Sequence, residues 1–296
     1  MGLWSATVTN RYATRDTPML IPGLLLLLVP LAAAFYLFAW PVLYRRWVMS
    51  RPFPEPWLAI ASRALPFWNR LSPALTTELQ DLIKWFIRTK TFIGCAGLEI
   101  TEEMKVVIAA QACLLLLNRP SYEYADVRFI YVYPSGFRVT RDVRNEIGLV
   151  STQSRDLLGE AWRSGKVILA WDEVERGTRN FNDGQNVVLH EFAHQLDNES
   201  GGADGAPLLY NRAAYKTWAR VFGEEFARLR AADPMDPGIL DRYGATNPAE
   251  FFAVATETFF EEPDMMYAHH RELFEQLLAY YRLDPRDWHR QPGGFG

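Results

Sequence analysis

The residues best suited to chemistry lie in one short stretch of the chain, His190-Glu-Phe-Ala-His194. Residues four apart lie one above the other on the same face of an α-helix, so His190 and His194 can direct two imidazoles at one metal ion. Glu191 lies next to that face, where its carboxylate can reach a water molecule on the metal. This HExxH spacing is typical of zinc peptidases. A core helix carrying two histidines by chance would bury polar groups without partners, which is costly.

A catalytic zinc ion usually takes three protein ligands and a water molecule, so one more ligand is needed. The compact HExxHxxGxxH motif is excluded, because position 197 is Asp and position 200 is Ser, and no histidine follows until His269. A glutamate on a later helix is the remaining common solution. The stretch 247–257 (NPAEFFAVATE) contains two candidates, Glu250 and Glu257.

These two glutamates lie two turns apart on one face of a very apolar helix. Buried carboxylates need a cation or firm hydrogen bonds, and a zinc ion meets that need. Glu250 also occupies the capping-box position after Asn247 and Pro248, where it would serve the helix alone. Spacing alone does not choose between Glu250 and Glu257.

Asp197 lies three residues after His194, near the face that carries the ligands. It is predicted either to orient an imidazole from behind the metal or to be a helix-end carboxylate without such a role. The remaining histidines, His269, His270 and His289, are assigned to surface or packing positions.

The strands and helices that could position these residues are predicted from the spacing of apolar residues and from helix-capping residues. Residues 127–133 and 167–171 are predicted to be strands, because β-branched and aromatic residues dominate them. The second lies just upstream of the histidine helix, where zinc peptidases commonly have an edge strand that holds the substrate backbone; an interior strand paired on both sides is the alternative. Helices are predicted at 72–87, 101–117 and 211–230, and a glycine-rich turn at 92–98.

The N-terminal region contains a long uncharged segment, residues 17–44. Its apolar centre, about residues 19–43, is long enough to cross the ~30 Å hydrocarbon core as a helix. A cleaved signal peptide would have a shorter apolar region, ending at its cleavage site. Ala32-Ala33-Ala34 is the candidate cleavage site here, but apolar residues continue beyond it. A buried hairpin of the domain core is the alternative.

Three arginines (Arg45, Arg46 and Arg51) follow this segment, and two (Arg11 and Arg15) precede it. The positive-inside rule therefore places the C-terminal domain in the cytoplasm. We expect an N-terminal tail and membrane helix within 1–48, a linker at 49–71 and a zinc metallopeptidase domain at 72–290. The linker is predicted from the proline-rich stretch RPFPEPW at 51–57, which is typical of a stiff connection. That domain is predicted to be α+β and zincin-like, mainly helical with a small mixed sheet.

Composition limits the possible partners and compartment. The net charge of −4 and the balanced charged residues argue against a nucleic-acid partner. The two cysteines, Cys95 and Cys113, are too few for a disulfide framework, and a reducing compartment fits them best.

The chain resembles the Mlc titration factor A family of zinc-dependent peptidases, gluzincins whose site is similar to that of anthrax lethal factor. The matching features are HEFAHQLD at 190–197, GGADGAP at 201–207 and YGATNPAEFFAV at 243–254, within a similarity covering roughly residues 70 to 285. The resemblance implies that Glu250 is the third zinc ligand and that Tyr243, seven residues earlier, faces the metal. Glu257 and Asp197 are then expected to contact the zinc ligands without binding the metal themselves.

On this interpretation His190, His194 and Glu250 bind one zinc ion, which lowers the pKa of a water molecule toward ~7. Glu191 is the general base, and Tyr243 donates a hydrogen bond to the oxyanion. The resemblance further implies aminopeptidase-like cleavage and binding of a transcriptional repressor, Mlc. The alternative is a non-catalytic zinc-containing module that sequesters a regulator.

The apolar N-terminal segment departs from the soluble members of the family. We therefore expect a single-pass protein of the inner membrane with its catalytic domain in the cytoplasm. A cytosolic protein is the alternative.

Overall fold

The computed structural model describes residues 28–119, 124–135, 165–233 and 238–289. The chain divides into two compact units, Met1–Arg51 and Pro52–Gly296. The first unit contributes one apolar helix and the second contains all of the candidate site residues.

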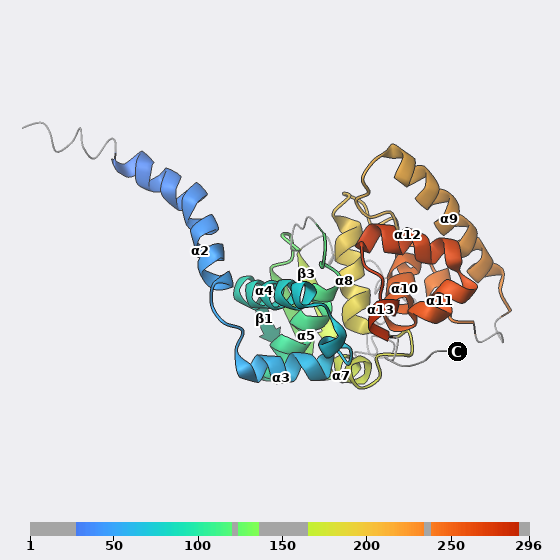
Figure 1. The fold of residues 1–296 in the computed structure, drawn as a ribbon, viewed down its shortest axis with the longest axis horizontal. Helices are drawn as coiled ribbons and strands as arrows, with labels where there is room; N and C mark the ends of the chain where they lie inside the picture. Colours follow the sequence, from blue (N-terminus) through green and yellow to red (C-terminus); the bar gives the residue numbers. More distant parts are fainter. Residues whose placement is uncertain (1–27, 120–123, 136–164, 234–237, 290–296) are drawn as a thin grey trace, which may run out of the picture. The chain divides into compact units, whose positions relative to one another are not determined.

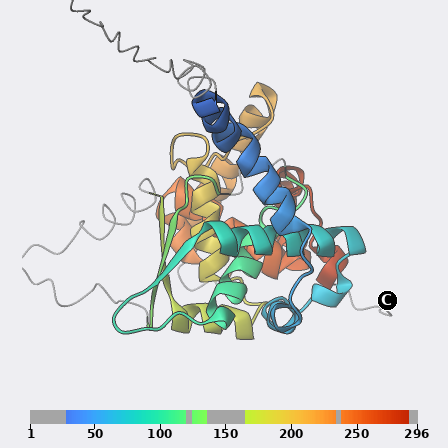
Figure 2. The same ribbon diagram turned by 90° about the vertical axis from the view of Figure 1, so that its left-hand side faces the viewer.

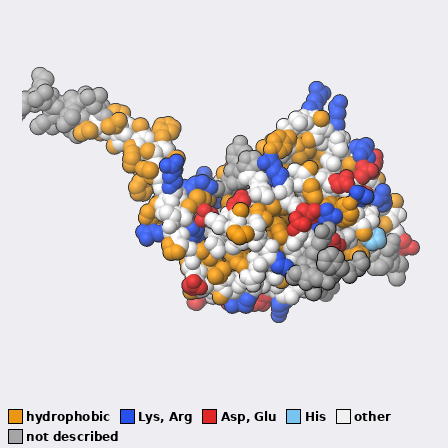
Figure 3. All heavy atoms as spheres, in the orientation of Figure 1, with side chains coloured by type: hydrophobic (Ala, Val, Ile, Leu, Met, Phe, Trp, Pro, Cys, Tyr) orange, Lys and Arg blue, Asp and Glu red, His pale blue; other side chains and the backbone are white. Residues whose placement is uncertain are grey.

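In the first unit the described residues form a helix, Leu28–Met49, which includes a π-helical stretch (Phe35–Ala39) and α2 (Trp40–Met49). Most of its large apolar side chains are exposed, as the orange surface of this segment in Figure 3 shows. The helix is long and apolar enough to cross a membrane, with a mean hydropathy of 1.4. Membrane spans and signal sequences share such length and composition. The predicted span begins at residue 19, and residues 19–27 lie outside the described part of the chain.

The second unit is mainly helical, with one small sheet (Figure 1). Its helices are α3 (Glu55–Ala64), α4 (Pro73–Thr89), α5 (Glu102–Leu114), α7 (Trp171–Arg179), α8 (Val187–Asn198), α9 (Arg212–Ala231), α10 (Pro248–Glu261), α11 (Pro263–His269), α12 (Arg271–Tyr281) and α13 (Arg286–His289), with 3-10 turns η2 (Trp68–Arg70) and η3 (Arg242–Ala245). Its strands are β1 (Thr91–Gly94), β2 (Phe129–Tyr133) and β3 (Lys166–Ala170).

The region predicted to be a linker, 49–71, is largely folded instead. It contains α3, and its residues Ala61, Ala64, Leu65 and Phe67 are fully buried in the core. The prolines that indicated a linker lie at the start of this helix, with Pro54 as the N-cap and a proline in the first turn. Proline is tolerated there because the first backbone N–H groups have no partner within the helix.

The described strands form a parallel sheet in the order β1-β2-β3, so the mixed sheet that we expected is wrong for these residues. Parallel neighbours need long crossover connections, and α5 lies in the connection between β1 and β2. Among the described strands, β3 pairs only with β2. Its other edge has no partner within the described residues.

Strand β1 occupies part of the segment predicted to be a turn, 92–98. Gly94 continues the pairing to Val132, and a Cβ at Gly94 would lie 1.9 Å from the carbonyl oxygen of Leu98. The glycine therefore permits a close backbone approach inside a strand. The turn itself comes next, at Ala96 and Gly97, which have positive φ angles.

Helix α8 lies between two groups of elements, with α3, α4, α5 and the sheet on one side and α9 to α12 on the other (Figure 1). It packs against α10, α5 and β3. Figure 2 shows the strands standing beside it. Every residue of α10 from Ala249 to Glu261 is buried. The two helices therefore form the centre of the core, where polar side chains must find partners.

The loop after α8 is tied to the start of α10 through Gly205. This residue has φ +79°, and a Cβ there would lie 2.3 Å from the carbonyl oxygen of Pro248. Its N–H donates to Asp197 Oδ2 at 2.8 Å, and its carbonyl accepts from Trp218 Nε1 at 2.9 Å. Only a residue without a side chain fits.

We expect Gly205→Ala to lower the free energy of unfolding by more than about 3 kcal/mol, because strain at positive φ adds to a backbone clash. Gly201→Ala is the matched control: its φ is +90°, and nothing lies within 4 Å of the added Cβ. Strain alone should cost about 1–2 kcal/mol there. Urea denaturation measures both variants, and equal losses would contradict the packing assigned to Gly205.

Candidate metal centre

Helix α8 begins at a fully specified N-cap. Asn186 Oδ1 accepts hydrogen bonds from Val188 N and Leu189 N, both at 3.1 Å. The cap satisfies backbone donors that have no partner within the helix. It therefore fixes the first turn of α8, from which His190 projects.

Two buried glutamates of α10 hold this cap in place. Glu257 Oε2 accepts from Asn186 N at 2.5 Å, and Glu261 Oε1 accepts from Asn186 Nδ2 at 3.1 Å. Glu261 Oε2 also accepts from Gln185 N at 3.1 Å. Burial raises the pKa of Glu261 to about 8. The start of α8 is thus bound to α10 by polar contacts inside the core.

The two imidazoles and Glu250 meet at one point. Glu250 Oε2 lies 3.0 Å from His190 Nε2 and 3.3 Å from His194 Nε2, and the two nitrogens are 3.2 Å apart. Side-chain exposure is 14% for His190, 0% for His194 and 8% for Glu250. These three residues offer a metal ion two nitrogens and one oxygen.

This donor set fits zinc. Ligands about 2.0–2.1 Å from a tetrahedral zinc ion stand about 3.3 Å from one another, close to the separations found here. Two imidazole nitrogens and a carboxylate oxygen are a common catalytic zinc set, which leaves one position for water. The residues present therefore suit the metal in number, type and spacing.

Glu257 lies on the far side of His190. Its Oε1 is 2.6 Å from His190 Nδ1, so the imidazole has one nitrogen directed at Glu250 and the other at Glu257. A carboxylate on Nδ1 fixes both the orientation and the tautomer of a metal-binding imidazole. The structure thus separates two glutamates that spacing could not distinguish. The Glu250 side chain reaches the imidazoles, while its backbone N–H donates to the cap residue Asn247.

Strong electrostatic coupling marks the site. Burial alone would lower the pKa of His190, but the carboxylates of Glu257 and Glu250 outweigh it and raise that pKa well above 6.5. Burial alone would raise the pKa of Glu250, but hydrogen bonds from His190 and His194 lower it to about 2. Neighbouring side chains whose pKa values are shifted by their surroundings are typical of functional sites.

Glu191 and Tyr243 flank these donors. Glu191 is partly buried, and its charge contributes to the raised pKa of His190. Tyr243, in η3, has its ring centroid 5.9 Å from that of His190 and is 51% exposed. The site thus has an acidic group on the same helix as the imidazoles and a phenol beside His190.

Asp197 contacts the loop that comes after α8. It is fully buried, and burial raises its pKa to about 7, partly offset by the hydrogen bond from Gly205 N. Within the described part of the chain its hydrogen bond is to this loop, and not to an imidazole. Of the other histidines, His270 pairs with Glu225 at 2.8 Å and His289 Nε2 bonds the carbonyl of Phe260 at 2.9 Å.

Sequence reasoning missed Asn186 and Glu261, which position α8 without taking part in chemistry. Asn186 could have been found, since an asparagine directly before an apolar helical run is an N-cap signature. Glu261 had no such signal, because its role depends on the contact between α10 and α8.

The arrangement of a histidine pair on one helix and a buried glutamate on another is that of a metallopeptidase centre. Comparison with known proteins agrees: a family model described as glucose-regulated metallo-peptidase M90 matches residues 41–282, and the chain belongs to this family. It is 38% identical over 272 residues to an uncharacterized protein of Synechocystis sp. (90% of this chain, 98% of the relative).

Relatives also include proteins named Mlc titration factor A. The chain is 31% identical over 236 residues to the one from Klebsiella pneumoniae (78% of this chain, 87% of the relative). It is 30% identical over 240 residues to the one from Cronobacter sakazakii (78% and 87%). The resemblance stated from the sequence is therefore confirmed at the level of the family.

We expect Glu250→Gln to abolish stoichiometric zinc binding, because it removes a ligand charge. Glu257→Gln should lower zinc affinity about 10–100-fold, as for other groups that orient a ligand. Competition with a chromophoric chelator measures both affinities.

Glu261→Gln provides the control, since Glu261 is buried one turn further along α10 and contacts Asn186 and Gln185 instead of an imidazole. Its zinc affinity should fall less than that of Glu257→Gln, because Glu261 acts on His190 only through the cap of α8. Zinc retained by Glu250→Gln and lost by Glu257→Gln would reverse the assignment of the two residues.

Proposed function

We propose that the chain is a zinc-dependent metallopeptidase that hydrolyses peptide bonds with aminopeptidase-like specificity. The observation that carries the proposal is the convergence of His190, His194 and Glu250 within 3.3 Å of one another. Glu191 follows His190 directly on the same helix. Membership of the metallopeptidase family supports the reaction class.

Zinc bound by these residues would act as a Lewis acid and lower the pKa of a coordinated water molecule to about 7. Glu191 is proposed to accept the proton from that water and to pass it to the leaving amine. His190 is held for its role by Glu257, which accepts from Nδ1 and so keeps Nε2 directed toward Glu250.

Tyr243 is proposed to donate a hydrogen bond to the oxyanion that forms on the substrate carbonyl. Its exposure supports this role, because the side chain stands beside His190 yet reaches solvent, where a substrate enters. The free edge of β3, among the described strands, is proposed to pair with the extended substrate backbone. β3 packs against α8, which carries the histidines.

A regulatory role is proposed on the basis of the relatives named Mlc titration factor A. That name supports an interaction with a transcriptional repressor of the Mlc type as a second activity. The competing function is a non-catalytic zinc-containing module that only sequesters such a regulator. Glu191 favours the enzyme, because a scaffold for zinc has no need of an acidic residue beside the metal.

For localisation, we propose a single-pass protein of the inner membrane with the catalytic domain facing the cytoplasm. The exposed apolar helix Leu28–Met49 supports the membrane location. Arg45, Arg46 and Arg51 near its C-terminal end support the orientation.

We expect Glu191→Gln to retain zinc and to lower peptide hydrolysis about 10²–10⁴-fold, because the general base is lost. Tyr243→Phe should also retain zinc and lower kcat about 10²–10³-fold, because one oxyanion donor is lost. Metal content and turnover are measured together on matched peptides with free and acetylated N-termini. An aminopeptidase cleaves only the free form.

Unchanged turnover in Glu191→Gln with full zinc would refute the mechanism. A protein that binds zinc and a repressor but hydrolyses neither peptide would favour the sequestering module.

Fractionation of cells that express the full chain tests the membrane proposal. The protein should sediment with membranes, resist extraction by carbonate and dissolve in detergent. A version beginning at Pro52 should be recovered without detergent and retain zinc. Recovery of the full chain in the soluble fraction would refute a spanning helix.

A further inference from the structure

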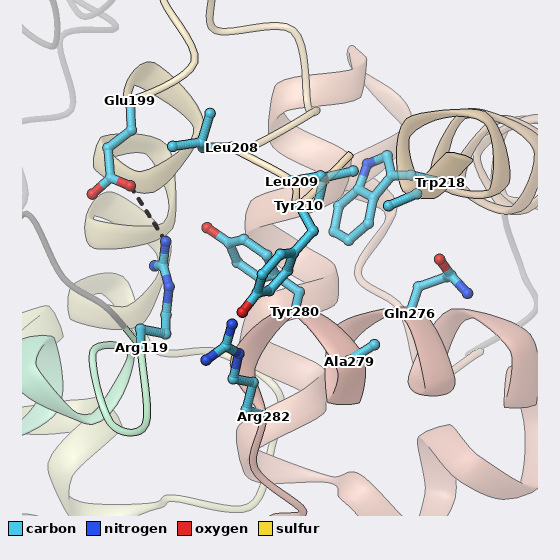
Figure 4. Close-up of a pocket in the computed structure, with 11 residues that line it drawn as sticks. Arg119, Glu199, Leu208, Leu209, Tyr210, Trp218, Gln276, Ala279, Tyr280 and Arg282 are labelled. Atoms are coloured by element: carbon cyan, nitrogen blue, oxygen red, sulfur yellow. Dashed lines mark hydrogen bonds and ion pairs between the residues drawn. The ribbon is translucent and has the colours of Figure 1, made fainter. Parts of the chain in front are cut away.

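A cavity of about 240 Å³ lies beside the C-terminal end of α8, the loop that leads away from this helix and α12 (Figure 4). Glu199, directly after α8, lines it and comes nine residues after His190 and five after His194. At 1.5 Å per residue these separations are about 14 Å and about 8 Å along the helix axis. The cavity is distinct from the metal centre, because its lining includes none of the three candidate ligands.

An incompletely satisfied arginine forms one wall. Arg119 Nη2 lies 3.3 Å from Glu199 Oε2, and the exposed fractions of the two side chains are 9% and 12%. Charge-assisted bonds of this kind are usually 2.7–2.9 Å, so the pair is a loose one. Arg119 Nη1 is buried and has no hydrogen-bond partner among the described residues. The guanidinium thus keeps donor capacity for another acceptor.

A second donor comes from Tyr280, whose ring lies 4.6 Å under the Arg119 guanidinium. Tyr280 is 9% exposed, and its hydroxyl has no hydrogen-bond partner among the described residues. Burial raises its pKa well above 10, so the hydroxyl remains protonated at neutral pH. Figure 4 shows it pointing toward the side of the cavity where Arg119 and Glu199 pair. Buried donors without acceptors are costly, so an acceptor that reaches them through a small movement of the Arg119 and Tyr280 side chains would relieve both.

The other walls define the charge and shape of an occupant. Arg282 lies 4.6 Å from the ring of Tyr210, so the cavity has two cationic groups and one carboxylate. Apolar surface comes from Leu208, Leu209 and Trp218. Tyr210 is 74% exposed and Leu208 is 48% exposed, as expected of side chains at an opening.

We propose that this cavity is a binding site for a monocarboxylic acid with an aromatic or aliphatic body. The carboxylate accepts hydrogen bonds from Arg119 and Tyr280, and the body packs against Trp218 and its apolar neighbours. The two arginines and one glutamate of the lining leave one excess positive charge, which the single negative charge of a monocarboxylate balances. A dianionic phosphate fits less well, because Glu199 stands beside Arg119.

Phenylacetate is the probe for this site, and 2-phenylethanol is its uncharged counterpart. Isothermal titration of the full chain in detergent should give saturable binding of phenylacetate and at least tenfold weaker binding of 2-phenylethanol. Carboxylates also coordinate zinc, so the titration is repeated on Glu250→Gln, where binding should persist. An acetylated tripeptide ending in phenylalanine distinguishes a free acid from a peptide C-terminus: tighter binding of the tripeptide assigns the carboxylate to a peptide end.

Adjacent tyrosines offer matched variants. Tyr280→Phe removes only a hydroxyl without a partner, so affinity for phenylacetate should fall about tenfold while the thermal midpoint does not fall. Tyr281→Phe removes a hydroxyl that bonds Thr256 Oγ1 at 2.9 Å outside the cavity. That variant should lose stability and keep its affinity.

Three results would overturn the proposal: no saturable binding of phenylacetate, equal binding of 2-phenylethanol, or the same affinity in Tyr280→Phe as in the unmodified chain. Tighter binding of benzyl phosphate than of phenylacetate would overturn the assignment of a single charge. Loss of binding in Glu250→Gln would assign the carboxylate to the metal centre instead.

Discussion

The buried contact between Glu257 and the start of α8 is the constraint on which the site depends. One oxygen of this carboxylate accepts from Asn186 N and the other faces His190 Nδ1. The first contact fixes where α8 begins, and the second fixes how the imidazole is turned. Cap and ligand are thus positioned by the same side chain, so the geometry of the site is inseparable from the packing of α8 on α10.

That packing places three carboxyl groups, those of Glu250, Glu257 and Glu261, on a helix buried along nearly its whole length. Carboxyl groups without polar partners would be very costly in such surroundings. Each has polar partners instead: ring nitrogens for Glu250 and Glu257, and backbone or amide N–H groups for Glu257 and Glu261. The core therefore holds a preorganised polar network, which supports a reactive centre better than a loop would.

Helix α8 also joins the metal centre to the second cavity. Its first turns carry His190 and His194, and the residue after its end, Glu199, reaches Arg119. Between them Asp197 holds Gly205, and Gly205 lies against Pro248 at the start of α10. A ligand that orders the chain around Glu199 would act on a segment packed against the helix that carries Glu250. The fold thus gives the two sites a short physical connection.

Much of the site was readable in the sequence, because its signals are local. The spacing of His190 and His194 follows from the helical repeat. The helices predicted to start at 72, 101 and 211 do begin there, because Ser72, Thr101 and Asn211 cap them. The strands at 127–133 and 167–171 were also recognisable, since β-branched residues concentrate there. The prolines at 52–56 misled, because a helix start and a linker accept the same proline pattern. Only the burial of residues 61–67 distinguishes the two, and burial is a property of the folded chain.

By itself the sequence determined the residue types of a metal site, the helix that presents two of them and an apolar N-terminal segment. These depend on neighbours only a few residues apart. Tertiary structure decided that Glu250 faces Nε2 of His190, beside His194, and that Glu257 faces Nδ1 on the other side of the ring. It also decided that Asp197 supports a loop and that Arg119, Glu199 and Tyr280 share a cavity. Such facts depend on how helices far apart in the chain pack together, and no local pattern encodes that contact.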